Sequence, residues 1–319
     1  MPRRNFIAKT ADAFVLKTLA ELLSNILKTG SFNISENGIR LREWDKSRTI
    51  MVDLELNDDN FSIFKYRLSE PLYAGLTLNH FHKVIRSIKK KDSIQLFIRA
   101  ETPNKLSVKK IPKENTRITT SSINIQNIQN IEAELPTGYG KPIIVPSPEF
   151  QKMCKDLGTF ESPIIRVSIK QSSIEFFADT EDIIDTVVEL GETDDPDDSS
   201  DDEEQEENVR ESSFAAEHLY KIAKISGLST SMQIFPGNQD IPFMIKSPVG
   251  SLGKIAIYIK TQELIEKEKT MVSDDEEDQE EDEEIVPVAK PLKKSVNIVT
   301  PSKTKKAADK KPVGRPRTK

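Results

Sequence analysis

Basic side chains recur at helical spacing in four stretches of the sequence, and clusters of this kind bind phosphates. In HFHKVIRSIKKKD (residues 80–92), Lys83, Arg86 and Lys90 are spaced i, i+3 and i+7, which is one stripe on a helix, opposite an apolar face. Exposed helix faces are often rich in lysine, and for a single helix that explanation is favoured. Four such helices favour a surface that lies along a polyanion. The candidate phosphate contacts are Lys17, Lys28, Lys83, Arg86, Lys90, Lys152, Lys155, Lys221 and Lys224.

The nucleic-acid contact that these residues predict is independent of base sequence. Reading base edges requires Asn, Gln and Arg side chains that project from an exposed recognition helix, and this signal is weak here. Contacts from lysine to phosphate position a protein on the backbone and read no bases. We therefore expect sequence-independent binding.

Motifs for catalysis and metal binding are absent from the sequence. It has no GxxxxGK[ST], GxSxG or HExxH motif, and its three histidines are not grouped with other ligands at metal-binding spacing. The single cysteine, Cys154, lies in a helical pattern without an evident catalytic partner. Asp45, Asp53, Asp58 and Asp59 fit strand ends and turns better than a two-metal site. We expect a binding protein with no enzymatic activity and no cofactor.

The net charge of −6 conceals three segments of different character. Residues 192–207 carry 11 acids and no base, and residues 274–284 carry 10 acids and no base. Residues 290–319 carry 11 Lys and Arg against one acid, which leaves a mildly basic body. Long like-charge blocks predict disorder. We expect a disordered acidic loop at 191–211 and a disordered tail at 266–319. No apolar run approaches the roughly 20 residues that span a bilayer, so no membrane contact is expected.

Apolar periodicity divides the body into two similar halves, residues 1–120 and 141–265, with helices expected at 12–29, 79–90, 148–157 and 214–226. Strand–turn–strand patterns at 31–45 and 164–179 overlay with an offset of about 135 residues, which aligns Ile39 with Ile174. This predicts a duplicated α+β domain, each copy with two helices on antiparallel sheet. Residues 121–140 connect the halves, and their Ile spacing fits a linker or an edge strand equally well.

Four separated segments carry a resemblance to a known family. They are NFIAKTADAFVLKTLAELLSNILKTGSFNISENGIRLREWDKSRTIMVDLEL, GLTLNHFHKVIRSIKKKDSIQLFI, SPEFQKMCKDL and IPFMIKSPVGSLGKIAIYIKT, in order between residues 5 and 262. Together they resemble the eukaryotic-type DNA sliding clamp family, proliferating cell nuclear antigen (PCNA). The resemblance implies a head-to-tail homotrimeric ring of two-domain subunits, with the helices lining a channel around double-stranded DNA. It also implies a processivity factor without catalysis, which is opened by a clamp loader and tethers DNA polymerase and other replication and repair proteins.

The resemblance also implies a partner site. Family partners insert a short hydrophobic segment, the PIP box, beneath the interdomain loop. The matching positions here are Trp44, Thr49, Met51, Ile131, Leu135, Pro136, Ile241, Pro242, Tyr258 and Ile259. The alternative for Trp44 and Tyr258 is that they are core aromatics. Ring closure would pair an edge strand near 114–122 with one near 173–180 of the next subunit.

Several features go beyond the family. KPVGRPRTK (residues 311–319) resembles an AT-hook, although a nuclear-localisation signal or a generic basic tail fits equally well. The acidic loop, linker and tail indicate a divergent clamp, such as one from a large DNA virus, that acts in the nucleus or at a viral replication site. Two alternatives remain open: a clamp relative with checkpoint or transcription duty, and an acidic chromatin-binding or chaperone-like protein.

Overall fold

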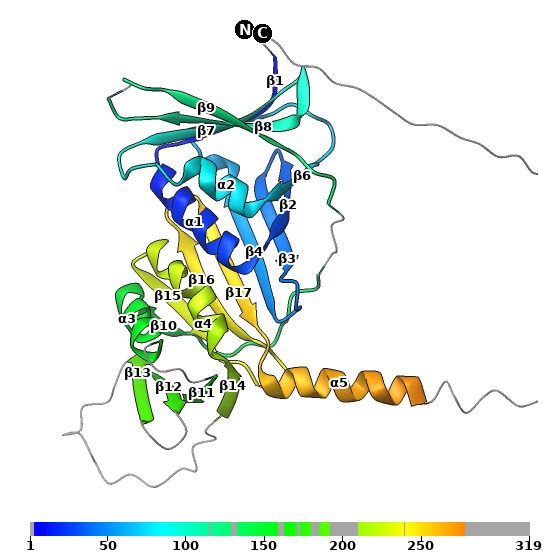
Figure 1. The fold of residues 1–319 in the computed structure, drawn as a ribbon, viewed down its shortest axis with the longest axis vertical. Helices are drawn as coiled ribbons and strands as arrows, with labels where there is room; N and C mark the ends of the chain where they lie inside the picture. The colour runs from blue at the N-terminus through cyan, green and yellow to red at the C-terminus, as the bar shows by residue number, and fades with distance from the viewer. Residues whose placement is uncertain are drawn as a thin grey trace, which may run out of the picture. The chain divides into compact units, whose positions relative to one another are not determined.

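Two halves of the chain repeat one order of strands and helices (Figure 1). The computed structural model describes residues 3–114, 116–128, 133–158, 163–170, 173–179, 185–191, 210–238 and 240–277, with the backbone alone at 179, 210, 211 and 271–277. Residues Met1–Asp274 belong to one unit, and the second unit, Asp275–Lys319, is described only for three helical residues at its start. The predicted acidic loop, apart from its ends, and the AT-hook-like segment lie outside the described residues.

The first half contains two helices and nine strands. Its elements are β1 (Arg4–Thr10), α1 (Ala13–Ile26), β2 (Thr29–Ser35), β3 (Gly38–Trp44), β4 (Ile50–Asn57), the 3-10 helix η1 (Asp58–Asn60), β5 (Ile63–Tyr66), β6 (Leu72–Thr77), α2 (Leu78–Ile85), β7 (Ser93–Arg99), β8 (Thr102–Ile111) and β9 (Thr119–Asn124). The second half repeats this order without an equivalent of β5. Its elements are β10 (Ile143–Pro146), α3 (Ser147–Leu157), β11 (Ile164–Ile169), β12 (Ser173–Asp179), β13 (Asp185–Gly191), β14 (Arg210–Ala215), α4 (Ala216–Ile222), the 3-10 helix η2 (Ala223–Gly227), β15 (Ser231–Phe235), β16 (Phe243–Val249) and β17 (Gly253–Ile259), followed by α5 (Gln262–Glu277).

One eight-stranded antiparallel sheet joins the halves, in the order β10-β15-β16-β17-β4-β3-β2-β6. Its central pair is β17 and β4, which run antiparallel with Gly253 opposite Leu56 and Ile259 opposite Ile50. We call this pair and the contacts around it the internal joint. The remaining strands form a five-stranded sheet, β5-β1-β7-β8-β9, and a four-stranded sheet, β13-β12-β11-β14. The predicted α+β fold and its duplication are therefore confirmed.

The helices lie on one face of the sheets, and apolar side chains fill the layer between them. Leu16, Leu19, Leu23 and Ile26 of α1 are all buried there, as their spacing predicts. The aligned positions Ile39 and Ile174 are also buried, on equivalent strands of the two halves. Alternating burial along these strands, with period two, places polar residues on the opposite face.

Three helices end earlier, or change form, compared with the sequence prediction. Helix α2 stops at Ile85 rather than at residue 90, because the N–H of Ile88 bonds to the carbonyl of Ile85 in a tight turn that buries the Ile88 side chain. Helix α1 ends at Ile26, where Leu27 becomes extended and leads into β2. Helix α4 begins at Ala216 and continues as the 3-10 helix η2. The predicted stripe of Lys83, Arg86 and Lys90 is therefore broken, because Lys90 lies beyond α2.

The connecting loop and the start of the tail also differ from the prediction. Strand β9 crosses residue 120 and reaches Asn124, so residues 119–124 adopt the edge-strand alternative. Residues 262–277 form α5, whereas the sequence predicted disorder from 266. The reason is local: Thr261 Oγ1 accepts the N–H of Leu264 at 3.2 Å, and Glu263 Oε1 accepts the Ser213 hydroxyl at 2.7 Å. Residues 278–319 lie outside the described part of the chain.

Candidate nucleic-acid and partner interfaces

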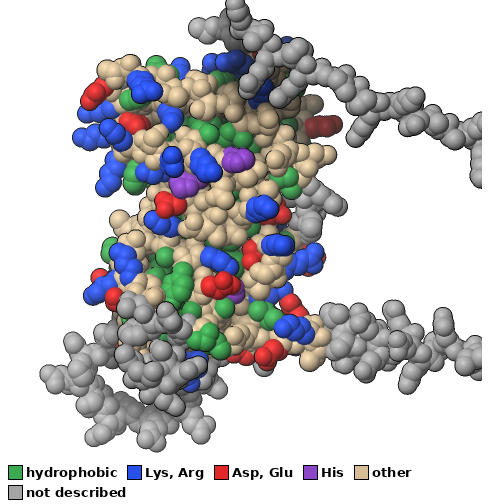
Figure 2. Space-filling model, viewed as in Figure 1, with side chains coloured by type: hydrophobic (Ala, Val, Ile, Leu, Met, Phe, Trp, Pro, Cys, Tyr) green, Lys and Arg blue, Asp and Glu red, His purple; other side chains and the backbone are tan. Residues whose placement is uncertain are grey.

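The helices form one row, and this row carries most of the predicted phosphate contacts. Helix α1 packs against α2 on one side and against α4 and η2 on the other, and α3 packs against η2 (Figure 1). Figure 2 shows Lys and Arg side chains spread over the face that carries the helices. Exposed on the row are Lys83, Arg86, Lys152, Lys155 and Lys224. The arrangement places cations from both halves on one surface.

Lys17 and Lys90 meet over the ring of Phe14. Their Nζ atoms lie 5.0 Å and 5.8 Å from the ring centroid, within the range of cation–π attraction. Lys17 also donates to the carbonyl of Ile88 at 3.4 Å. These contacts dock the turn after α2 onto α1, so Lys90 stays beside the row although it is not on the helix.

The cations of the second half are partly neutralised. Lys224 of η2 forms an ion pair of 2.9 Å with Glu21 of α1, and Lys221 forms one of 3.2 Å with Glu217 on its own helix. Lys28, between α1 and β2, lines a hollow near Trp44 that it shares with Lys221. The exposed positive charge is therefore greatest at the α2 end of the row.

A small apolar cluster covers the outer face of the internal joint, on the side away from the helices. Met51, Met244, Ala256 and Tyr258 are buried in it, and Trp44 packs at its rim. The connecting loop contributes buried Ala133, and the partly buried Leu135 and Tyr139 also pack against the cluster.

Two hydrogen bonds fix the loop over this cluster. Arg42 Nη1 donates to the carbonyl of Ala133 at 3.2 Å, and the Tyr139 hydroxyl donates to the carbonyl of Pro242 at 2.8 Å. Burial, and to a lesser degree the neighbouring Tyr258, raises the pKa of Tyr139, so its hydroxyl remains a donor at neutral pH. The loop is thus a tethered cover that lies directly on apolar side chains.

The structure separates the predicted partner residues into groups. We call the small apolar cluster on the outer face of the internal joint the outer cluster, and it contains Trp44, Met51, Leu135 and Tyr258. Pro242 is buried nearby, Pro136 and Ile241 are partly buried, and Ile131 lies outside the described residues.

Ile259 was wrongly placed at the partner site, because it is buried in the inner core beneath the helices. Strand alternation explains the error: Ile255, Ile257 and Ile259 face inward, whereas Ala256 and Tyr258 face outward. The same rule, applied to the sequence, would have found Ala256 and also Met244, which is paired with Tyr258. Tyr139 gave no periodic signal, because it lies in an irregular loop.

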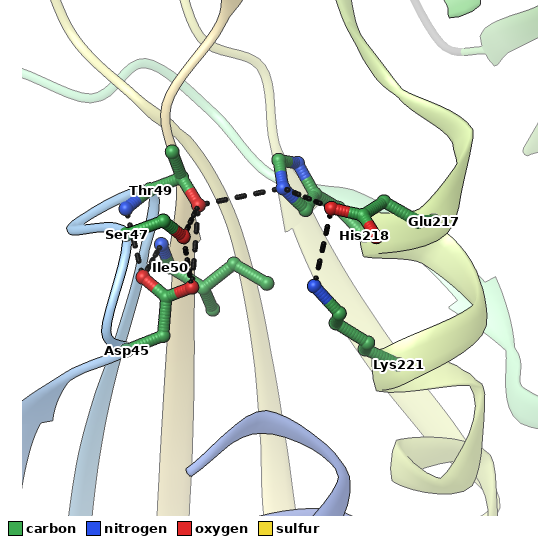
Figure 3. Close-up of polar contacts among 7 residues, drawn as sticks. All are labelled: Asp45, Ser47, Thr49, Ile50, Glu217, His218 and Lys221. Carbon is green, nitrogen blue, oxygen red and sulfur yellow. Dashed lines mark hydrogen bonds and ion pairs between the residues drawn. The ribbon is translucent and has the colours of Figure 1, made fainter. Parts of the chain in front are cut away.

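Thr49 belongs to a different contact, in the turn between β3 and β4 (Figure 3). The Asp45 carboxylate accepts the N–H groups of Thr49 at 2.8 Å and Ile50 at 2.9 Å, and the Ser47 hydroxyl at 2.5 Å. Burial raises the pKa of Asp45, but these hydrogen bonds outweigh it, so the pKa lies below its ordinary value. Thr49 Oγ1 then meets His218 Nε2 of α4 at 3.4 Å. This contact links the two halves on the helix side of the internal joint.

A catalytic triad would need a different geometry from the one that Asp45, Thr49 and His218 adopt. The carboxylate contacts the hydroxyl rather than the imidazole, and His218 Nδ1 is buried with no hydrogen-bond partner among the described residues. Burial also raises the pKa of the Cys154 thiol to about 12, which keeps it neutral. The described residues contain no group of three or more potential metal ligands, and no described helix is long and apolar enough to cross a membrane.

The two smaller sheets end in four strands that are paired on one side only among the described residues: β5 and β9 in the five-stranded sheet, and β13 and β14 in the four-stranded sheet. Among the described residues, β9 is paired only with β8, and β13 only with β12. The predicted joining strand at 173–180 is therefore wrong, because it corresponds to β12, which is paired on both sides. Ile118, just before β9, and Val187 of β13 are half exposed, at 50% and 55%. Both edges thus present apolar side chains beside unpaired backbone.

Comparisons with known proteins agree with this architecture. Residues 5–134 match the family model "Proliferating cell nuclear antigen, N-terminal domain", and residues 136–262 match "Proliferating cell nuclear antigen, C-terminal domain". A "Probable DNA polymerase sliding clamp 1" of Paramecium bursaria Chlorella virus 1 is 23% identical over 80% of this chain and 95% of its own length. "Proliferating cell nuclear antigen 2" of Drosophila melanogaster is 24% identical over 79% of this chain and 95% of its own.

A crystal structure of the Entamoeba histolytica proliferating cellular nuclear antigen has the same fold. It superposes with a TM-score of 0.69 at 18% identity, over 81% of this chain and 99% of that one. The two family models lie end to end and together span both halves of the fold, including the internal joint. The chain therefore belongs to the proliferating cell nuclear antigen (PCNA) family.

Proposed function

We propose that this chain is a DNA sliding clamp, in which three copies form a closed ring around duplex DNA. One observation carries the proposal: two of the edge strands, β9 and β13, are the counterparts of the two strands already joined inside the chain. Strand β9 closes the first half as β17 closes the second, and β13 follows α3 as β4 follows α1. Pairing β9 with β13 of the next copy would therefore repeat the internal joint. A head-to-tail contact of this kind generates a ring when its rotation closes.

The row of helices would face the DNA. Repeating the internal joint places α3 of one copy beside α2 of the next, so the helices would continue around the ring. Lys83, Arg86, Lys152 and Lys155 would then contact phosphates, with Lys17 and Lys90 behind them. Contacts of this type hold the backbone without reading bases, as a protein that moves along DNA requires.

The outer cluster would receive partner proteins. Met51, Tyr258 and Trp44 supply an apolar surface, and the tethered loop with Leu135 would move aside for a hydrophobic PIP-box segment. DNA polymerase, other replication and repair proteins and a clamp loader are the partners expected from the family. The chain would act without catalysis or cofactor, in the nucleus or at a viral replication site.

The proposal is tested by measuring the mass in solution and the stimulation of a DNA polymerase on a long primed template. We expect the mass of three chains and longer products per binding event. A monomer at all concentrations, or a trimer that leaves product length unchanged with every replicative polymerase from its source, would contradict it.

A further inference from the structure

A basic hollow lies at the end of the five-stranded sheet where β9 begins. Its volume is about 880 Å³, and its cationic lining residues are Lys89, Lys90, Lys91, Lys110, Lys113 and Arg117. The carboxylates in the lining are those of Asp92 and Glu114, so cations outnumber acids. Figure 2 shows Lys and Arg side chains gathered over this end of β7, β8 and β9. The hollow has the charge and size to hold a polyanionic segment.

Two walls of the hollow, the turn after α2 and the end of β8, are held together. Asp92 Oδ2 accepts the N–H of Lys89 at 2.9 Å, which closes the turn after α2. Lys110 Nζ donates to the Ser87 hydroxyl at 2.9 Å, which ties β8 to the same turn. The cations therefore converge because of the fold, and are not simply neighbours in the sequence.

The internal joint indicates what would lie beside the hollow in the ring. There the first residue of β17, Gly253, is opposite Leu56, near the end of β4. Transferred to the open edges, this register places Thr119, the first residue of β9, near the last residue of β13, Gly191, of the next copy. Thr119 itself lines the hollow.

The chain that continues from Gly191 is the most acidic segment of the body. Residues 192–207 carry 11 acids and no base, and they begin at the residue after β13. A segment attached at the joint has a high effective concentration there. We propose that the basic hollow binds the acidic segment 192–207 of the neighbouring copy, which adds an electrostatic contact to the strand pairing between subunits.

This inference rests on the proposed ring, and it favours the acidic segment over DNA as the occupant. DNA would be held by the helix row, whereas Lys113 and Arg117 belong to the loop that leads into the open edge. Complementary charge between subunits also strengthens specific assembly and suppresses wrong pairings.

A cross-link between different copies tests the contact directly. Chains with Asp195→Cys are mixed with chains with Lys113→Cys under mild oxidation, and the parent Cys154 stays silent because it is buried. We expect a covalent dimer that contains one chain of each kind. Lys105→Cys is the control, since it alternates with buried Leu106 and so lies on the outer face of the same sheet. A yield no greater than that of the control, from a protein that is trimeric, overturns the docking but not the ring.

Salt dependence supplies an independent test. One variant replaces every acid in 192–207 by Asn or Gln, and a second carries Lys91→Glu, Lys113→Glu and Arg117→Glu. Each should raise the dissociation constant of the trimer about tenfold at 0.1 M salt, with little effect at 1 M, and the combination should do no more than either alone. If the second variant lowers DNA retention and leaves trimer dissociation unchanged, the occupant is DNA and the proposal is wrong. A parent chain that is monomeric throughout overturns the ring itself.

Discussion

The joint inside the chain and the open edges that would form the joint between chains use equivalent strands but carry different charge. At the internal joint, β17 pairs with β4, and Lys224 of the second half is neutralised by Glu21 of the first. At the open β9 edge, Lys83 and Arg86 form no ion pair with any described residue, and the basic hollow lies alongside. The α3 end carries Lys152 and Lys155 together with Glu149 and Asp156.

In the proposed ring, one architecture would serve two purposes. The internal joint is permanent, so it can be closed by apolar packing on both faces and by paired charges. The proposed joint between chains would form after folding, and an excess of positive charge beside it would favour both DNA and the acidic segment 192–207. The predictions below alter one joint while leaving the other intact.

The largest effect is expected from a charge at the open edge. Val187→Glu, or Ile118→Glu, would place a carboxylate where the proposed joint excludes water, and should raise the trimer dissociation constant more than about a hundredfold. The fold of each chain should be unchanged, because both side chains are exposed in the single chain. Sedimentation measures the change in the trimer dissociation constant. The control is Ile63→Glu in β5, which is the other edge of the five-stranded sheet that contains β9. A trimer that withstands both substitutions would exclude these edges from the joint.

A substitution at the internal joint should lower the stability of the single chain rather than dissociate the trimer. Asp45→Ala removes the acceptor of two backbone N–H groups and a hydroxyl in the β3–β4 turn, and should lower the free energy of unfolding by about 2–3 kcal/mol. Urea denaturation measures this loss. Ser47→Ala removes one of these bonds and should cost less. An equal effect of both variants would show that the backbone contacts of Asp45 do not stabilise the turn.

Retention on DNA should depend on the cations at the α2 end of the helix row, and not on cations elsewhere on the surface. Lys83→Glu with Arg86→Glu should weaken binding about tenfold at 0.1 M salt and flatten its salt dependence, because fewer counterions are released. The trimer should persist. Lys105→Glu with Lys109→Glu makes the same change of charge on the outer face of the five-stranded sheet and should have little effect. If the two pairs weaken binding equally, the helix row is not the DNA surface.

The smallest effect concerns His218, whose imidazole meets Thr49 across the internal joint. Burial lowers its pKa, Lys221 lowers it further, and Glu217 and Asp45 oppose them. The unfolded chain therefore binds a proton more readily, so stability is fully present above the ordinary histidine pKa of about 6.5 and declines as the pH falls below it. The melting temperature should drop more between pH 7.5 and 5.5 in the parent than in His218→Gln. An identical drop in both would remove His218 as the cause.

Much of the fold was predictable from the sequence, because amphipathic stripes such as Leu16, Leu19 and Leu23 depend on local periodicity. The duplication was also visible, since equivalent strands keep the same alternation. The residue at which α2 ends was not predictable, because it depends on burial of Ile88 against distant elements. The edge strand was misassigned for a similar reason: only the complete pairing order shows that β12 is central and β13 is open.

The candidate sites were predictable in part. Spacing found Lys83 and Arg86, but it could not show that Glu21 neutralises Lys224, because that ion pair joins residues from different halves. Trp44 and Tyr258 were found by resemblance, and strand alternation corrects Ile259. The basic hollow had no sequence signal beyond its lysines, since its walls come from two loops that the fold brings together.

Retention on end-capped DNA tests most directly whether the protein encircles the duplex. A linear duplex is fixed to a bead at one end, the protein is added, the free end is capped with a bulky protein, and the bead is washed at 0.5 M salt. We predict that the trimer is retained until a restriction enzyme cuts the duplex, and is then released by sliding off the new end. Loss during the wash despite the cap, or equal retention before and after cutting, would contradict encirclement.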